Sequence, residues 1–397
     1  MTSQVYIVSC PGYDRIYEKM GELLSLMGGM SQFVKPGDRI VLKPNLLLSA
    51  KPEQAVTTHP GVVAAIARMV RKEGAFAVIA DSPGTGTPHN KRMLNGVYRK
   101  CGMFEAADAG GAELNFDASY RPVSFPDGKL IKHFDVITPV LEACGVFNLC
   151  KLKTHLLMSI TGAVKNNFGV IPGLAKPGYH AKLRDRDHFA DMLLDLAEYV
   201  SHRISIMDAV LAMEGDGPGA AGTPRHIGLL LGSTNPLALD IVASEIIGLR
   251  REENPLLTAA ARRGLSPAGI EEIDVIGAEM SKIRASNFRL PSTAGLGNIL
   301  TWWQKLLEPF FKSWFSQEPR VIGKKCIGCG ICRDSCPVNA ITVIENERKY
   351  AHIDAGQCIR CYCCHELCPE AAVELRRSPM HRILVTGARD RQHPRCG

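Results

Sequence analysis

The sequence predicts a layered α/β protein with a largely parallel sheet, followed by a small α+β domain. Over residues 1–285, short apolar runs alternate with segments whose apolar residues recur every three or four positions. This βα rhythm is typical of a parallel sheet covered by helices. Near the C-terminus the rhythm stops and two nearly identical cysteine-rich runs follow. We therefore expect an α/β pocket domain at 1–285 and a cysteine-rich domain at 320–377.

Six apolar runs are the expected strands of the sheet. Several are short and do not alternate with polar residues, as in strands that are buried on both faces. Ligands of such sheets bind at the carboxyl ends of the strands, so the residues that follow each run are candidates for a site. The runs are residues 5–8, 39–42, 77–80, 145–149, 204–207 and 227–231.

Helices are expected between these strands. One is predicted over residues 60–74, with Thr58 as its N-cap, because threonine side chains satisfy the first free N–H groups of a helix. A second is predicted over residues 188–202. The first carries an apolar stripe at helical spacing, made of Val62, Val63, Ile66, Met69 and Val70.

Two cysteine runs dominate the C-terminal part of the chain. The first starts at Cys326 and the second at Cys358, and each has the spacing C-x2-C-x2-C-x3-C-P. Three thiolates on one tight loop cap three irons of a cubane cluster, and the fourth cysteine of each run binds the other cluster. Zinc sites usually pair two CxxC units, so zinc is disfavoured. The expected ligands are Cys326, Cys329, Cys332 and Cys368 for the first cluster, and Cys358, Cys361, Cys364 and Cys336 for the second.

The flanks of the two runs repeat as well, because a strand-like segment follows the last cysteine of each. This part of the chain resembles a two-cluster bacterial-type ferredoxin. We therefore expect a ferredoxin-like domain that holds two [4Fe–4S] clusters. Cys363 stands beside a predicted ligand and is either an additional ligand or, as we favour, a thiol that packs against the cluster.

Charge and cysteine content restrict the class of protein. Residues 1–285 carry 31 Lys and Arg against 30 Asp and Glu, so most of the net charge of +7 lies beyond them, partly in a basic tail at 378–397. No basic stripe interleaved with aromatic residues is visible, so we expect no nucleic-acid partner. The cysteines outside the cluster sets show no disulfide spacing and the N-terminus shows no export signal. The sequence therefore predicts a cytoplasmic protein.

The segment at 286–319 interrupts the pattern between the two domains. All three tryptophans of the chain lie within residues 301–315, beside lysines and a proline. Aromatic residues and lysines suit an interfacial membrane helix, but the segment is short and only weakly basic. We favour an aromatic linker or arm that packs between the domains, with contact to a membrane as the alternative.

Lysines, histidines and amides cluster after the expected strands, among apolar residues and glycines. Buried ammonium groups hold an anion or polarise a carbonyl, and histidine transfers protons near neutral pH. Asp208 is expected to counter the lysines, whereas residues 81–84 are explained equally well as a turn. The candidate catalytic residues are Lys153, His155, Lys165 and Glu214, and the candidate substrate-binding residues are Lys43, Asn45, His59, Lys151 and Asn166.

Four short elements resemble the domain-of-unknown-function family 362, whose members often carry a C-terminal two-cluster ferredoxin segment. The resemblance covers residues 5–250 and 320–376 and implies an iron–sulfur protein with a redox role. The elements are Lys43-Pro44-Asn45, Lys151-x-Lys153-Thr154-His155, Thr161-x-x-x-Lys165-Asn166-x-Phe168-Gly169 and Glu214-Gly215-x-Gly217-Pro218.

Clusters fused to a pocket domain predict delivery of single electrons to a bound molecule. The leading hypothesis is a reductase of a small anionic, carbonyl or quinonoid substrate, supplied by an external ferredoxin or flavodoxin. The alternative is an electron carrier or accessory protein whose α/β domain docks a partner and exposes its charges. The glycine strings match no nucleotide-binding fingerprint, so we expect no nicotinamide cofactor. A single metal ion held by His59 and His155 is disfavoured because their spacing matches no compact ligand motif.

Overall fold

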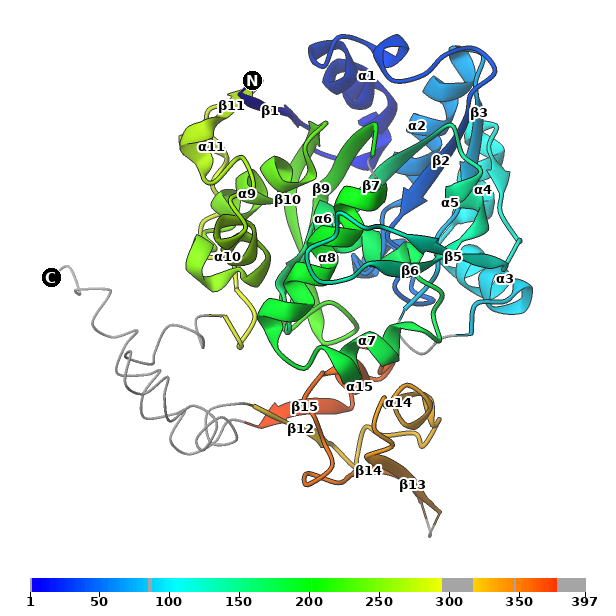
Figure 1. The fold of residues 1–397 in the computed structure, drawn as a ribbon, viewed down its shortest axis with the longest axis vertical. Helices are drawn as coiled ribbons and strands as arrows, with labels where there is room; N and C mark the ends of the chain where they lie inside the picture. Colours follow the sequence, from blue (N-terminus) through cyan, green and yellow to red (C-terminus); the bar gives the residue numbers. More distant parts are fainter. Residues whose placement is uncertain (1, 85–87, 201, 295–316, 346–347, 377–397) are drawn as a thin grey trace, which may run out of the picture.

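Nine strands form one sheet in the part of the chain that the structure, a computed structural model, describes (Figure 1). The described residues are 2–84, 88–200, 202–294, 317–345 and 348–376. The strands are β1 (Ser3–Ser9), β2 (Arg39–Pro44), β3 (Phe76–Ile79), β4 (Glu113–Leu114), β7 (Gly145–His155), β8 (Ser159–Thr161), β9 (Ile204–Gly215), β10 (Gly222–Ser233) and β11 (Ile273–Ile276). A separate hairpin consists of β5 (Tyr120–Ser124) and β6 (His133–Ile137).

The sheet is mixed but mostly parallel. Its order is β11-β1-β10-β9-β7-β2-β3-β4, and β8 folds back onto the end of β7. β7 pairs in parallel with β2 and β9, and β2 pairs in parallel with β3. β10 is antiparallel to both of its neighbours. The predicted layered, largely parallel α/β architecture is confirmed.

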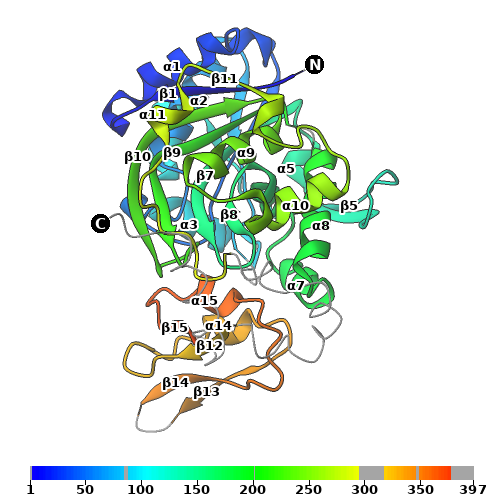
Figure 2. The same cartoon turned by 90° about the vertical axis from the view of Figure 1, so that its left-hand side faces the viewer.

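Helices cover both faces of the sheet (Figures 1 and 2). Along β2, Ile40 and Leu42 face one apolar core and Val41 faces the other, because side chains alternate along a strand. The first core is shared with α1 (Ile16–Leu26), α2 (Pro60–Lys72), α3 (Lys91–Lys100) and α4 (Met103–Gly110). The second is shared with α5 (Thr138–Leu141), α6 (Ala163–Asn166), α7 (Lys176–Lys182), α8 (Arg186–Val200), α9 (Pro236–Ile246), α10 (Pro255–Arg262) and α11 (Met280–Ile283).

The predicted cap of α2 is wrong by one residue. His59 is the N-cap, and its Nδ1 accepts a hydrogen bond from the N–H of Gly61. Pro60 then occupies the first helical position, where its missing N–H costs nothing. Thr58 instead ties two strands together, since its hydroxyl accepts from the N–H of Asn45 and donates to the carbonyl of Leu149. The buried strand contacts therefore outcompete the helix terminus for the threonine hydroxyl.

Two strands continue well past their predicted ends. β7 extends to His155 and β9 extends to Gly215, because polar residues after each apolar run still pair with neighbouring strands. The predicted site residues Lys151, Lys153 and His155 therefore lie inside a strand and not in the loop after it. Alternation along β7 places all three on the same side.

The C-terminal part forms a small domain of two hairpin-like strand pairs and two short helices. β12 (Glu318–Val321) pairs with β15 (Val373–Arg376), and β13 (Ile341–Glu345) pairs with β14 (Lys349–Ile353). The helices are α14 (Ile331–Asp334) and α15 (Cys363–Glu366). In both views α15 is the helix of this domain nearest the α/β domain (Figures 1 and 2).

The α/β domain extends beyond its expected limit at residue 285. Phe288 is buried against the second core, and Arg289 pairs with Glu214 of β9. The expected linker at 286–319 thus begins with residues that pack on the sheet, and β12 starts at Glu318. The expected arm at 301–315 and tail at 378–397 lie outside the described residues. Among the described residues, no helix is long and apolar enough to cross a membrane.

Candidate functional site

Buried lysines gather at the carboxyl ends of the central parallel strands. Lys43 is the last residue but one of β2, and Lys151 and Lys153 lie in the last part of β7. Each is at most 1% exposed, as is His155. An ammonium group loses its hydration when it is buried, so each of these lysines needs a partner or pays an electrostatic cost.

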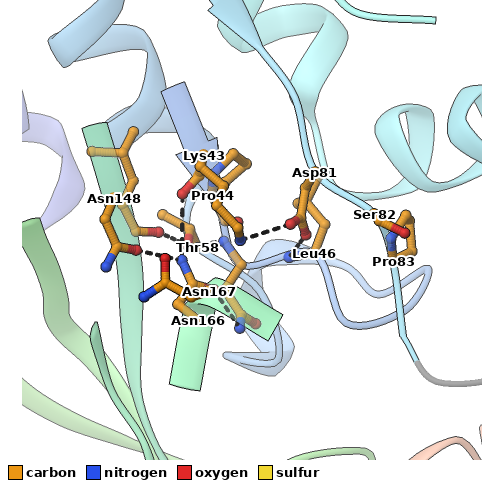
Figure 3. A network of polar contacts seen from close by, with 12 residues as sticks. Lys43, Pro44, Leu46, Thr58, Asp81, Ser82, Pro83, Asn148, Asn166 and Asn167 are labelled. Atoms are coloured by element: carbon orange, nitrogen blue, oxygen red, sulfur yellow. Dashed lines mark hydrogen bonds and ion pairs between the residues drawn. The ribbon is translucent and has the colours of Figure 1, made fainter. Parts of the chain in front are cut away.

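Lys43 is neutralised by a carboxylate from the loop that follows the neighbouring strand β3. Its Nζ donates to Oδ1 of Asp81 at 2.7 Å, and the N–H of Leu46 donates to Oδ2 of the same carboxylate (Figure 3). Burial nevertheless raises the pKa of Asp81. Gly169 packs over the pair, and a Cβ there would lie 2.1 Å from Oδ1 of Asp81. The last glycine of the Thr161–Gly169 element is thus required for close packing.

Lys151 belongs to a second buried pair. Its Nζ donates to Oδ2 of Asp208 at 2.7 Å, and the hydroxyl of Tyr13 donates to Oδ1 at 2.8 Å. The ring of His59 stacks on Tyr13 with 3.5 Å between ring centres. Burial lowers the pKa of His59 to about 4, so its imidazole is neutral at physiological pH. His59 and His155 thus have different partners, and the described residues form no group of three His, Cys, Asp or Glu around one metal ion.

The predicted amides form a chain between these strands. Nδ2 of Asn45 donates to Oδ1 of Asn166, and Nδ2 of Asn166 donates to Oδ1 of Asn148. Asn148 and Asn166 are labelled in the left half of Figure 3. Asn45 and Asn166 therefore fix the positions of β2, β7 and α6 relative to each other. Sequence reasoning missed Asn148, which lies in the middle of an apolar run.

Asp240 of α9 holds the start of α6. Its two carboxylate oxygens accept from the N–H groups of Ala163 and Val164, and Gly162 leaves room for the contact. Nothing near Asp240 in the sequence indicates this role, because its partners lie more than seventy residues away.

Asp240 makes the stability of the protein depend on pH. Burial raises the pKa of Asp240 to about 7, above its value of about 4 in the unfolded chain. The native state therefore binds this proton more tightly, and the resulting stability is present at low pH and lost as pH rises from about 4 to about 7. We therefore expect the free energy of unfolding, measured in urea, to fall as pH rises through this range. This slope should be steeper than that of Asp240→Asn by up to about 1.4 kcal/mol per pH unit. Equal slopes would contradict this assignment.

The remaining lysines lack a carboxylate of their own in the α/β domain. Nζ of Lys153 donates to the carbonyl of Val56 at 2.6 Å, and Nζ of Lys165 lies 6.0 Å from the centre of the Phe168 ring. Burial is the largest cause that lowers the pKa of both lysines, while Glu366 of the C-terminal domain opposes it. These two lysines are thus the groups of the predicted set that are least well neutralised.

His155 lies beside these lysines and faces the C-terminal domain. Its Nδ1 accepts from the N–H groups of Leu157 and Met158, so in the neutral ring the proton resides on Nε2. Burial, together with the lysines, holds the pKa of His155 well below its usual range. Nε2 is 3.1 Å from Oε1 of Glu366, although the two atoms are not aligned for a hydrogen bond.

Two residues change the predicted site. Glu214 does not join the lysines, because both of its oxygens accept hydrogen bonds from Arg289. Lys176 of α7 was missed, and its Nζ donates to the carbonyls of Ser82 and Pro83. Burial lowers the pKa of Lys176 to about 7. No sequence signal distinguishes Lys176, since it stands at the start of a short helix far from the other elements.

The C-terminal cysteines surround two hollows. Cys326, Cys329, Cys332 and Cys368 line one, and Cys336, Cys358, Cys361, Cys363 and Cys364 line the other. The last cysteine of each run therefore lies with the first three of the other run. Backbone N–H groups donate to four of the sulfurs, those of Cys326, Cys336, Cys358 and Cys368. Such donors favour thiolates, so this set of residues suits iron–sulfur clusters.

The two runs share one backbone conformation but not the same residues. Gly328 and Gly330 have φ of +64° and +80°, and Arg360 and Tyr362 occupy the matching positions with φ of +58° and +64°. Side chains are strained in this left-handed region, whereas glycine is not. Tyr362 is buried and its hydroxyl donates to the carbonyl of Gln317.

Comparisons with known proteins match both parts of the chain. The model of the family described as "Domain of unknown function (DUF362)" matches residues 40–245, and that of the "4Fe-4S dicluster domain" matches residues 325–372. The thylakoid-associated protein sll1697 of Synechocystis sp. is 34% identical over 274 residues, which are 68% of this chain and 83% of that protein. The C-terminal part is thus an iron–sulfur electron-transfer domain of the 4Fe-4S dicluster type.

Two solved structures show a more distant similarity. The lactate racemase apoprotein from Thermoanaerobacterium thermosaccharolyticum is 10% identical, with a TM-score of 0.38, and the match covers 59% of this chain and 54% of that one. A protein from Thermotoga maritima is 12% identical, with a TM-score of 0.36, and the match covers 58% of this chain and 57% of that one. The match thus spans little more than half the length of each.

Proposed function

Because the chain belongs to the family described as "Domain of unknown function (DUF362)" and carries a 4Fe-4S dicluster domain, we propose that it is an oxidoreductase. Its substrate is a small anionic, carbonyl or quinonoid compound that binds in the α/β domain. The electrons come from two [4Fe–4S] clusters, one in each cysteine-lined hollow. The protein works in a reducing compartment, the cytoplasm.

The observation that carries this proposal is the position of Lys153, Lys165 and His155 between the sheet and the cluster domain, where Lys153 and His155 are buried and Lys165 is partly buried. A protein that docks a partner through this region would need its charges on an exposed face, but Lys153 and His155 are each 1% exposed. Buried, incompletely neutralised ammonium groups are typical of sites that bind or polarise a ligand. The alternative role as an electron carrier or accessory protein is therefore less well supported.

The residues of this site have distinct roles in a reduction. The clusters supply single electrons at low potential. Lys153 and Lys165 hold the anionic part of the substrate and polarise the bond that is reduced. His155 carries its proton on Nε2, the atom that faces the cluster domain, and is placed to donate a hydrogen bond or a proton. Lys43 and Lys151, paired with Asp81 and Asp208, hold the strand ends in position.

Electrons enter through the first cysteine run. Ile327 and Ile331 are 57% and 41% exposed on either side of the exposed Cys329, and Lys324 and Lys325 lie nearby on the surface. An apolar patch with a basic edge fits an acidic one-electron carrier, such as a ferredoxin or a flavodoxin. The second run faces the α/β domain through α15, so electrons leave on that side.

Replacing Cys336 tests the exchange of ligands between the runs. We expect Cys336→Ala to remove the cluster formed mainly by the second run, although Cys336 belongs to the first, and to lower the iron content from about eight to about four per chain. Iron analysis and low-temperature EPR of the reduced protein measure this. Cys363→Ala is the matched control: Cys363 also lines the hollow, but the C-x2-C-x2-C spacing of the second run makes Cys364 the expected ligand. Loss of one cluster in Cys363→Ala with two retained in Cys336→Ala would contradict the assignment.

Reoxidation of the reduced protein tests the proposed function. The protein is reduced anaerobically with dithionite, freed of excess reductant and mixed with quinonoid, enone and keto-acid acceptors while the cluster absorbance is followed. We expect one class of acceptor to reoxidise the clusters rapidly and in a saturable manner. If no small acceptor does so while a purified ferredoxin or flavodoxin exchanges electrons freely, the carrier role is correct.

A further inference from the structure

The segment that binds the second cluster inserts a carboxylate among the lysines. Glu366 is the last residue of α15, and its side chain is 3% exposed. α15 also contacts the α/β domain closely, because a Cβ on Gly219 would lie 2.1 Å from the carbonyl oxygen of Glu366. Nε2 of His365 is 3.0 Å from the carbonyl oxygen of Asp216. The Glu366 carboxylate is thus held inside the site by the contacts of α15 with the loop between β9 and β10.

Glu366 fits its surroundings less well than Asp81 and Asp208, the two carboxylates that pair with Lys43 and Lys151. Asp81 and Asp208 each accept a lysine hydrogen bond of 2.7 Å on one oxygen and a backbone N–H on the other. By contrast, Oε1 of Glu366 and the facing Nε2 of His155 have no aligned hydrogen-bond partner among the described residues. Buried polar atoms are nearly always hydrogen-bonded in native proteins. We therefore interpret these two unpaired atoms, which face each other, as part of a site that also binds a ligand.

The charges around Glu366 favour an anion in its place. Glu366 acts on both Lys153 and Lys165, yet Lys153 donates its hydrogen bond to a carbonyl and not to the carboxylate. The carboxylate of Glu366 thus lies 3.1 Å from Nε2 of His155 and acts on two lysines, but it forms no ion pair with either lysine among the described residues. A flat anion with two oxygens can accept from several of these donors at once, whereas the glutamate is constrained by its own backbone.

We propose that Lys153, Lys165 and Nε2 of His155 form a carboxylate-binding subsite, which Glu366 occupies in this structure and which the carboxylate of the substrate takes over. This inference rests on the proposed function and narrows its substrate to a carboxylic acid. Since Lys153 and His155 are 1% exposed, the substrate enters only when α15 moves away. Glu366 thus acts as an internal competitor of the substrate.

Removal of the glutamate side chain tests the subsite directly. Glu366→Ala leaves space for acetate, so we expect sodium acetate to raise its melting temperature by about 2 °C at ten times the dissociation constant. Acetamide, which has the same shape without charge, and sodium chloride should give no such rise. The wild type and Glu370→Ala, which loses an exposed glutamate of the same domain, should show a much smaller rise, because Glu366 competes with acetate in both. The melts are followed anaerobically by far-UV circular dichroism.

Two results would overturn the proposal. One is a folded Glu366→Ala variant with its full iron content and no response to acetate; the other is an equal response in the wild type. If Glu366→Ala does not fold, hydrogen exchange of the wild type is measured over residues 363–376. Acetate, but not acetamide, should then speed exchange there by competing with Glu366, and unchanged exchange would refute the subsite. Acetate binding without any acceptor turnover would leave the subsite standing and refute the reductase, while turnover without acetate binding would do the reverse.

Discussion

Lys153→Met should reduce the rate of substrate-dependent reoxidation by about 10²–10³-fold, the usual cost of removing one preorganised charged or hydrogen-bonding group from an active site. Methionine fills most of the volume of lysine but carries no charge. Because Lys153 is fully buried and burial is the main cause of its lowered pKa, its removal should not destabilise the fold. The measurement is the rate at which the best acceptor restores the cluster absorbance of the dithionite-reduced variant.

The control for this prediction is Lys51→Met, which removes an exposed lysine from a nearby loop. It should reoxidise at the rate of the wild type. Both variants should contain the same iron per chain and show the same EPR spectrum, so that a loss of rate cannot be attributed to a lost cluster. A Lys153→Met rate within about twofold of the wild type would remove Lys153 from the active site.

Asp208→Ala should lower the free energy of unfolding by about 3–5 kcal/mol, the cost of leaving one member of a buried ion pair without its partner. Lys151 would then be a fully buried ammonium group without a counterion. The hydroxyl of Tyr13 and the N–H of His59 would also lose the oxygens to which they donate. Anaerobic unfolding in urea measures the change.

An exposed ion pair provides the comparison for Asp208. The side chains of Arg121 and Glu142 are 55% and 59% exposed, so Glu142→Ala should cost no more than about 1 kcal/mol. The double variant Asp208→Ala with Lys151→Met should recover part of the lost stability, because it also removes the unpaired charge. If Asp208→Ala costs no more than Glu142→Ala, the pair is not the electrostatic anchor of these strands.

Much of the architecture could be predicted because it depends on local patterns. Short apolar runs such as residues 39–42 and 77–80 mark strands buried on both faces, and the structure places strands there. The spacing of lysines and His155 in the Lys151–His155 element equals the two-residue repeat of a strand. That repeat brings them to one side even though their strand continues further than the apolar run indicated.

The rest depends on contacts between residues far apart in the sequence. Asp240, Lys176 and Glu366 reach the site from separate elements, and none of them stands in a distinctive local pattern. Glu366 is the clearest case, since it is one of the spacer residues between Cys364 and Cys368. Nothing in the cysteine run indicates that its side chain contacts the α/β domain. The error for Glu214 is the opposite one. Its position beside glycines after a strand predicted that it belongs to the site, but its carboxylate binds Arg289 instead of the lysines.

Arg360 and Tyr362, the two residues of the second cysteine run with positive φ, make the two halves of the cluster domain different from each other. A duplicated unit begins with two equivalent halves, and either could in principle face the α/β domain. Gly328 and Gly330 keep the first half free of strain, whereas Arg360 and Tyr362 cost the second half about 1 kcal/mol each or more. In return Tyr362 is buried and anchors the half that lies against the lysines. The two halves are therefore no longer interchangeable, and exchanging their sequences would turn the domain away from the site that it serves.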